Sequence, residues 1–237
     1  MNVTDLLKRL ALGELSNLSL ATGGIISAAK VPTIIQYTNE ALHKLYTKYL
    51  LNEKDLILEL REDITYYHLL KRFAYSQYDP LNPPTQWNRP YIMDMGREPF
   101  TEDVIKVLSV YDQNGTDLPL NDTEQVYSVF TPQAQQLQVP HPVDGQILCV
   151  SYQAKHPTIP TIDYEEVGID LPECLHSALC AYITSKLYMH MNTAESTAKG
   201  QEHSFTFDKL CQEVIEMDLV STTSSITNTR FQKRGFI

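Results

Sequence analysis

Lysine and arginine are scarce in the middle of this sequence. Residues 101–170 contain two basic residues, Lys106 and Lys155, against eleven acidic ones, a net charge of −9. The remaining residues, 1–100 and 171–237, contain 17 basic and 18 acidic residues, so nearly all of the total charge of −10 lies in one block. A field of one sign repels polyanions, and duplex binding needs Lys and Arg to displace counterions. The acidic block is therefore not expected to bind nucleic acid.

Other absences narrow the class of protein further. Nine glycines in 237 residues argue against a glycine-rich nucleotide cradle. No stretch approaches the roughly 20 consecutive apolar residues that a membrane span needs. The first 20 residues are interrupted by charged side chains, unlike a secretory signal, and the four cysteines show no framework spacing. We therefore expect no membrane association, and reduced thiols in a protein made in the cytosol.

Catalytic signatures are missing as well. The sequence contains no Walker-type phosphate loop, G-x-G-x-x-G, H-E-x-x-H or G-x-S-x-G motif. Cys174, His176 and Cys180 are close in sequence, but a structural zinc site wants four ligands. They are more simply read as a packed cysteine and a histidine at the rim of the core.

The acidic cluster of Asp163, Glu165, Glu166 and Asp170 has a similarly plain interpretation. It lacks the glycine and the ligand order of a calcium loop, and we interpret it as a solvated run of charge. Cys149 and Cys211 have no basic neighbour in sequence that would lower a thiol pKa. We therefore predict that the protein is not an enzyme and has no catalytic, cofactor-binding or metal-binding residues.

Helical periodicity marks both ends of the chain. Apolar residues recur at helical spacing over residues 3–11 and again from Pro32 to about Leu51. Near the other end, Asp170 resembles an N-cap, with Pro172 just inside a helix. A further helix is expected over residues 194–219, with an apolar face that includes Ala198, Phe205, Leu210, Val214, Ile215 and Met217.

Strand and turn signals fill the middle. Alternation over residues 56–60 indicates a strand, for which Ile64–Leu70 is the expected hairpin partner. Five prolines interrupt residues 75–100, which we interpret as an extended arm; the alternative is a loop folded back on its own domain. The turn Asp112-Gln113-Asn114-Gly115 lies among further expected strands. These strands are 104–110, 116–120, 125–130, 136–139 and 146–153.

These elements predict an α+β fold. N- and C-terminal helices (residues 1–55 and 168–220) would form an antiparallel helical bundle. A β-rich module (56–167, with the arm at 75–100) would be inserted between them. Residues 221–237 are polar, and we expect an extended tail that is disordered until it meets a partner.

This layout resembles the head-to-tail adaptor proteins of tailed phages, including the tail tubular protein A type. The resemblance rests on Asn39–Tyr49, on Asp112–Asp122, on Leu171–Tyr188, and on the following helix to Leu219. It covers most of the chain as a pattern of elements and has no invariant signature.

The resemblance implies a structural virion protein of the neck or tail. Adaptors of this kind form a homo-oligomeric ring, usually of twelve copies, between the portal protein and the tail tube, nozzle or tail fibre proteins. DNA would pass through the ring without specific binding. A wall of carboxylates in the lumen offers DNA nothing to adhere to, although the same charge could instead serve the choice of partner.

Three groups of residues follow as candidates under this hypothesis. The first would bind the portal or another partner: Arg230, Phe231, Lys233, Arg234 and Phe236. The second would contact a neighbouring subunit from the arm: Tyr78, Trp87 and Tyr91. The third would form an acidic lumen or partner surface: Asp112, Asp117, Asp122 and Glu124.

Two other classes of protein remain open. A small cytoplasmic enzyme with an unrecognised site would show a deep pocket with convergent polar groups and shifted titrations. A monomeric regulatory or chaperone-like binding module would not need the two complementary faces that a closed ring requires.

Overall fold

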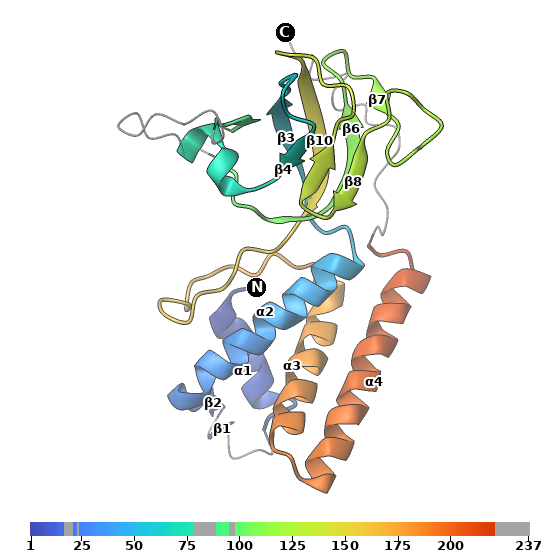
Figure 1. The fold of residues 1–237 in the computed structure, drawn as a ribbon. Helices are drawn as coiled ribbons and strands as arrows, with labels where there is room; N and C mark the ends of the chain where they lie inside the picture. The colour runs from blue at the N-terminus through green and yellow to red at the C-terminus, as the bar shows by residue number, and fades with distance from the viewer. Residues whose placement is uncertain (17–20, 23, 78–88, 95–97, 221–237) are drawn as a thin grey trace. The chain divides into compact units, whose positions relative to one another are not determined.

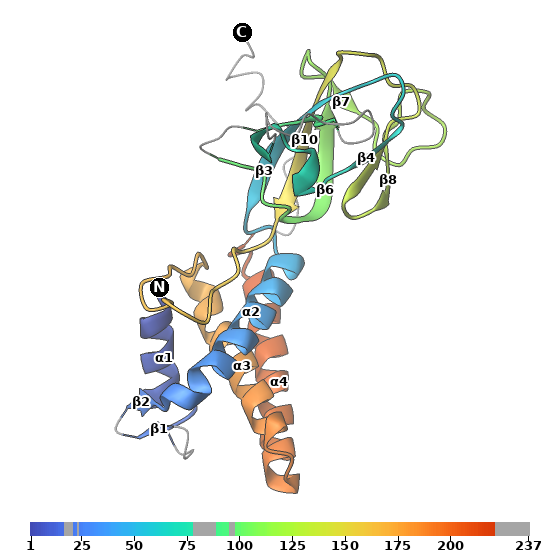
Figure 2. The ribbon, with the colours of Figure 1, turned by 60° about the vertical axis from the view of Figure 1, so that its left-hand side comes forward.

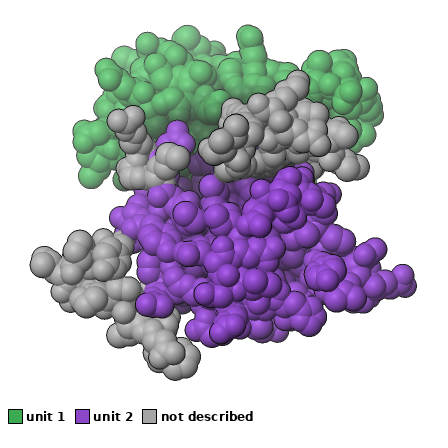
Figure 3. Space-filling view, turned by 90° about the horizontal axis from the view of Figure 1, so that it is seen from above, with its two compact units in different colours: residues 1–51, 156–223 green, residues 52–155, 224–237 purple. Residues whose placement is uncertain are grey.

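The computed structural model describes residues 1–16, 21–22, 24–77, 89–94 and 98–220. It is a mixed α and β structure in which four α-helices accompany two antiparallel sheets (Figures 1 and 2). The chain divides into two compact units (Figure 3). We call Met1–Leu51 with the described part of His156–Thr223 the helical unit, and Asn52–Lys155 the β unit.

The helical unit contains helices from both ends of the sequence. Helix α3 contacts each of the other three helices, and it is buried on more than one side, as its all-round apolar sequence requires. A two-residue pair of strands, β1 and β2, follows the first helix. The bounds are α1 Val3–Leu12, β1 Ala21–Thr22, β2 Ile25–Ile26, α2 Val31–Lys48, α3 His176–His190 and α4 Ala194–Glu216, with short 3-10 turns at Ala28–Lys30 and Glu173–Leu175.

Local signals explain the ends of these helices. In α1 the Asn2 side chain accepts from the backbone N–H of Asp5 at 2.7 Å, and the Asp5 carboxylate accepts from the N–H of Asn2 at 3.4 Å. This is a reciprocal capping box. Thr193 and Ser196 form another at the start of α4. Pro32 lies in the first turn of α2, where its missing N–H costs nothing.

The start of α3 differs from the prediction. Asp170 does not cap the helix, because a 3-10 turn at Glu173–Leu175 lies between it and the start of α3 at His176. The backbone of Asp170 is used otherwise: its N–H donates to Nε2 of His156 at 3.2 Å, and its carbonyl accepts from the Tyr46 hydroxyl. An N-cap residue directly precedes the first turn of its helix. Here tertiary contacts hold Asp170 six positions before α3 begins.

The predicted apolar face of α4 is wrong in part. The residues that α4 buries are Ser196, Gly200, Phe207, Cys211 and Val214. Ala198 and Phe205 point away from the core, and Phe205 is 73% exposed. Gly200 determines which face of α4 packs against α3. The two helices approach so closely at this position that a Cβ on residue 200 would lie 2.7 Å from Cγ of Met189. Ser185 reinforces the approach by donating to the Gly200 carbonyl at 2.8 Å.

The β unit contains a five-stranded sheet in the order β5-β3-β10-β6-β7 and a three-stranded sheet in the order β4-β9-β8. Every described strand pair in them is antiparallel. One apolar core draws on both sheets, with Leu58, Val110 and Val150 from the first and Tyr67 and Leu137 from the second. The bounds are β3 Glu53–Glu59, β4 Tyr66–His68, β5 Ile92–Met93, β6 Val104–Tyr111, β7 Asp117–Leu118, β8 Phe130–Gln133, β9 Gln136–Gln138 and β10 Ile147–Ala154, with 3-10 turns at Lys71–Phe73 and Tyr75–Gln77.

Two strand predictions are corrected. Ile64–Leu70 is not a hairpin partner for β3, because its strand β4 pairs with β9 in the other sheet, and β3 pairs with β10 and β5. Residues 125–129 are not strand either, since β8 begins at Phe130. The turn at 112–115 is confirmed: the N–H of Asp112 donates to the Thr116 carbonyl at 3.0 Å, and Gly115 has a φ of 80° that favours glycine.

The boundary between the units also differs from the expected one. Residues 156–167 belong to the helical unit, where they contact α1 and α2. The N–H of Val3 donates to the Val167 carbonyl at 3.1 Å. Asn39 bonds both backbone groups of Ile159: its Nδ2 donates to the carbonyl at 3.0 Å and its Oδ1 accepts from the N–H at 2.9 Å.

Candidate functional site

The four predicted surface carboxylates lie in the β unit, two on a hairpin and two on the following loop. Asp112 begins the turn after β6, where its Oδ1 accepts from the N–H groups of Asn114 and Thr116, both at 2.8 Å. Asp117 lies on β7, opposite Tyr111. Its side chain is exposed, although partial burial raises the pKa of its carboxyl.

Asp122 and Glu124 lie on the next loop. Oδ1 of Asp122 accepts from the N–H of Glu124 at 2.9 Å, and the Glu124 side chain is exposed. No lysine or arginine occurs between Val107 and Ala154, a stretch that contains all four of these carboxylates and also Asp144. The hairpin and the loop therefore carry negative charge with no basic residue near them in sequence.

The acidic block seen in the sequence is divided between the two units. Residues 101–155 belong to the β unit, and the cluster of Asp163, Glu165, Glu166 and Asp170 belongs to the helical unit. All four side chains of that cluster are exposed, and Asp163 has a left-handed backbone with a φ of 55°. The block is therefore not one continuous feature of either unit.

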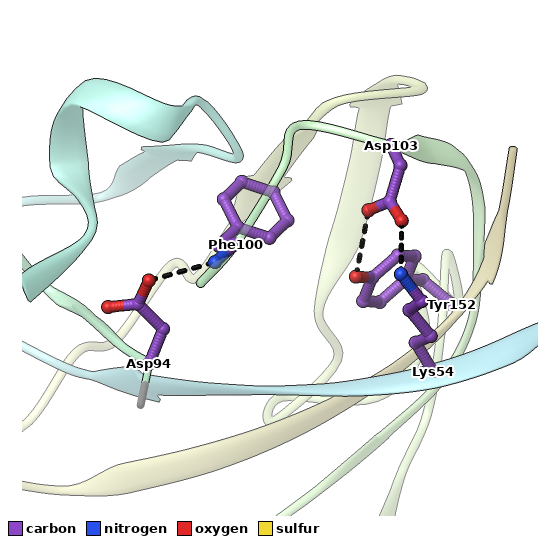
Figure 4. Close-up of polar contacts among 5 residues, drawn as sticks. All are labelled: Lys54, Asp94, Phe100, Asp103 and Tyr152. Atoms are coloured by element: carbon purple, nitrogen blue, oxygen red, sulfur yellow. Dashed lines mark hydrogen bonds and ion pairs between the residues drawn. The ribbon is translucent and has the colours of Figure 1, made fainter. Parts of the chain in front are cut away.

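A polar contact that the sequence did not predict centres on Asp103, just before β6 (Figure 4). Its Oδ1 accepts from the Tyr152 hydroxyl at 3.0 Å, and its Oδ2 pairs with Nζ of Lys54 at 2.6 Å. Burial and the nearby carboxylate raise the pKa of Tyr152, so the phenol stays protonated and donates. The contact ties the start of β6 to β10 and β3, which is a structural role.

Asp94 organises a second contact, shown at the left of Figure 4. Its carboxylate accepts from the N–H of Phe100 at 2.8 Å and from the N–H of Ser76 at 2.7 Å, and also from the Ser76 hydroxyl. Burial alone would raise its pKa, but these hydrogen bonds outweigh it and hold the pKa below its usual value. The ionised carboxylate is fully used in joining these segments.

The four cysteines are free thiols, three of them buried. Burial raises the pKa of Cys149 and of Cys180 to about 12, so both stay protonated thiols near neutral pH. His176 lies beside the Leu171 carbonyl, with Nε2 at 3.1 Å. Within the described residues, no three His, Cys, Asp or Glu side chains are grouped so that they could hold a metal ion.

The prediction that residues 75–100 form an arm against a neighbouring subunit is wrong at Tyr91. Part of this segment lies outside the described residues. Tyr91 is 3% exposed and belongs to the core of its own β unit, where its ring stacks on Phe73 with centroids 4.8 Å apart. Its hydroxyl donates to the His68 carbonyl at 2.9 Å. Tyr91 therefore follows the alternative in which this segment folds back, and does not face a neighbouring subunit. Tyr78 and Trp87 lie outside the described residues, as do Arg230, Phe231, Lys233, Arg234 and Phe236 of the tail.

Two apolar side chains on the loop after β7 were also missed. Val126 and Tyr127 are 69% and 76% exposed, whereas the sequence pattern placed them in a strand. The turn-forming residues Asn121-Asp122-Thr123 directly upstream were the available signal.

Comparisons with known proteins add no family. No protein-family model matches the chain, and no curated protein matches it. Among the helices that the structure describes, none combines the length and the apolar character needed to cross a membrane.

Proposed function

We propose that the chain is a structural virion protein, a head-to-tail adaptor whose copies form a ring between a phage portal and the tail tube or nozzle. In this proposal the helices of both chain ends form an antiparallel bundle, and the β unit is a module inserted into it. The ring gives DNA a passage and performs no catalysis. Twelve copies are expected by resemblance to other adaptors.

The observation that carries the proposal is the charge of the β unit. Residues 107–154 contain five carboxylates and no lysine or arginine, and the side chains of Asp117 and Glu124 are exposed. Such a surface repels phosphate, which suits a wall past which DNA must slide. It does not suit a protein that grips DNA, because counterion release requires basic side chains.

Exposed apolar side chains on the helical unit support contact between copies. Phe205 is 73% exposed on α4, and Met217 and Leu219 just beyond that helix are 65% and 54% exposed. A closed ring needs two different complementary patches on each subunit, and apolar side chains left in solvent by one copy are candidates for one of them.

The direct test is to mix the full chain with the portal protein of its own phage and to examine the mixture by electron microscopy. The proposal predicts a ring seated on the portal. A portal that stays bare at micromolar concentrations of a folded chain would contradict it. A monomer in the absence of portal does not decide the question, because the portal itself can template the ring.

A second arm tests the tail. A chain that ends at Val220 lacks all three basic residues of the tail, Arg230, Lys233 and Arg234. It should keep its melting temperature and lose portal binding. If the truncated chain bound the portal as well as the full chain did, the tail would not be the portal-binding element. An enzyme, the alternative class, would keep its turnover after the same truncation.

A further inference from the structure

The loop after β7 holds two neighbouring apolar side chains in solvent; with the first two residues of β8 it comprises residues 120–131, here called the 120–131 loop. Val126 is 69% exposed and Tyr127 is 76% exposed. Among the large apolar side chains of the described residues, Tyr127 has the greatest exposed fraction. Scattered surface apolar residues are ordinary, so the question is whether the loop is built to present this pair.

Backbone hydrogen bonds close the base of the loop. The N–H of Asn121 donates to the Val129 carbonyl at 2.8 Å, and the N–H of Val129 donates to the Pro119 carbonyl at 2.9 Å. Leu120 and Val129 form a parallel bridge there. Val129 is 1% exposed and belongs to the core of the β unit, so the core anchors the end of the loop.

Side chains fix the loop a second time. Oδ1 of Asn121 accepts from the N–H of Thr131 at 2.8 Å, and its Nδ2 donates to Oγ1 of Thr131 at 2.9 Å. Asn121 itself has a φ of 59°, a conformation that asparagine tolerates better than most residues. These bonds join the start of the loop to Thr131 in strand β8.

Ser128 completes the support directly behind the exposed pair. Its hydroxyl accepts from the N–H of Asp122 at 2.9 Å and donates to the Pro119 carbonyl at 3.0 Å, and the residue is 1% exposed. The N–H of Ser128 donates to the Gln125 carbonyl at 3.2 Å. The backbone on both sides of Val126 and Tyr127 is therefore held by hydrogen bonds.

A fixed loop lowers the entropy that must be lost when a partner binds. Tyrosine is among the residues that most often dominate protein interfaces, because it offers a large rigid area with a polar end. The loop thus has both parts of a docking element, a preorganised backbone and an exposed apolar anchor.

The charge around the anchor limits the chemistry of the partner. Asp122 and Glu124 lie within five residues of Tyr127, and Asp117 lies on the preceding strand. Two copies of this loop would place like charges against one another, which disfavours a self-contact. A complementary surface would have an apolar pocket with a rim of lysine or arginine.

We propose that the 120–131 loop docks a second protein, distinct from this chain, by inserting Val126 and Tyr127 into an apolar pocket rimmed by basic side chains. The inference deepens the proposed function and rests on it for the complex, since the partner would be the next protein of the virion neck. The loop geometry itself does not depend on a ring.

The experiment places a photo-crosslinker in the loop of the full chain. The variant Tyr127→p-benzoylphenylalanine, irradiated in purified virions, should crosslink to one other protein at a peptide that contains Lys or Arg. The matched control is Val143→p-benzoylphenylalanine, because Val143 is 61% exposed in a different turn of the same unit. The control should give no such product.

Affinity measurements with the crosslinked partner then test the anchor. The double variant V126S/Y127S should bind at least about 30-fold more weakly and melt at the same temperature, because both side chains are exposed. V143S should bind as the wild type does. Raising the salt concentration from about 0.05 M to about 0.5 M should weaken wild-type binding several-fold, because salt screens the charged rim.

The outcomes separate the two proposals. Virions that lack the chain overturn the adaptor function, and the same crosslinking in infected cells then tests the loop alone. Crosslinks from position 127 only to copies of this chain, equal crosslinking from position 143, or no product at all would overturn the docking loop. So would unchanged partner affinity in V126S/Y127S.

Discussion

The two units of the chain differ in how each is assembled from the sequence. In the helical unit, Tyr49 donates to the Cys211 carbonyl, 162 residues away, and Asn39 bonds Ile159, 120 residues away. In the β unit, the Tyr91 hydroxyl reaches His68 over 23 residues, but the Ser151 hydroxyl reaches Asp55 over 96. The β unit is one continuous stretch, whereas the helical unit exists only when both chain ends meet.

This difference has a physical consequence. The helical unit encloses the whole β unit as one long loop, and closing that loop costs entropy. The contacts between the two chain ends in the helical unit, such as those of Asn39 and Tyr49, must offset that entropy. The β unit should hold its structure without the helices.

The largest expected effect comes from core truncation in each unit. Leu58→Ala in the β unit and Leu45→Ala in the helical unit both remove a fully buried side chain, and each should cost about 2–5 kcal/mol. Hydrogen exchange should show loss of protection in the β unit for Leu58→Ala and in the helical unit for Leu45→Ala. Equal loss in both units for either variant would break the comparison.

The next effect tests the long-range ties directly. Asn39→Ala leaves both backbone groups of the buried Ile159 without their side-chain partner. It should lower the free energy of unfolding of the helical unit by about 1–3 kcal/mol, measured by denaturant titration. Gln36→Ala, at an exposed position of the same helix, is the control and should change little.

Acid should weaken the β unit through Asp94. Because its pKa in the folded protein is below its ordinary value, its ionisation adds stability above the unfolded pKa, about 3.9. That stability is lost as the pH falls through the folded pKa. Asp94→Asn should be roughly 1–2 kcal/mol less stable at pH 7, and thermal melts should show the gap closing below about pH 4. A constant gap would refute the assignment.

The smallest effect compares two glycines. Gly115 in the β unit has a φ of 80°, and Gly168 in the helical unit has no left-handed backbone. A Cβ would meet nothing within 4 Å at either position. Gly115→Ala should therefore cost about 1 kcal/mol from backbone strain alone, visible as a lower melting temperature, and Gly168→Ala should be nearly neutral. Equal shifts would contradict the assignment of the cost to backbone conformation.

Much of the fold followed from local pattern. The helix from Pro32, the strand at 104–110 and the turn at 112–115 were predicted because periodicity and turn residues act within a few positions. The mixed α and β class followed from the order of these elements. Residues whose role is local were thus placed well by sequence alone.

The errors share a non-local cause. Ile64–Leu70 was paired with the wrong strand because sequence proximity suggested a hairpin, while its strand β4 finds β9 some 70 residues on. Asp170 was taken for a cap because its contacts with Tyr46 and His156 lie far away in sequence. The face of α4 depends on how closely α3 approaches Gly200, which periodicity does not encode.

The candidate site was less accessible to sequence analysis. The charge of residues 107–154 could be counted, but the division of the acidic block between the units could not. Val126 and Tyr127 fit a strand by composition, and only the bonds of Asn121 and Ser128 make them the tip of a loop. Tyr91 likewise looked like a surface aromatic among prolines until its ring was found stacked on Phe73.

The central claim is that this chain forms a ring in a virion neck, and electron microscopy of the intact neck tests it most directly. The account predicts a closed ring of this chain between the portal and the tail, with carboxylates of the β unit facing the DNA channel. A neck reconstructed in full without this chain would contradict the claim.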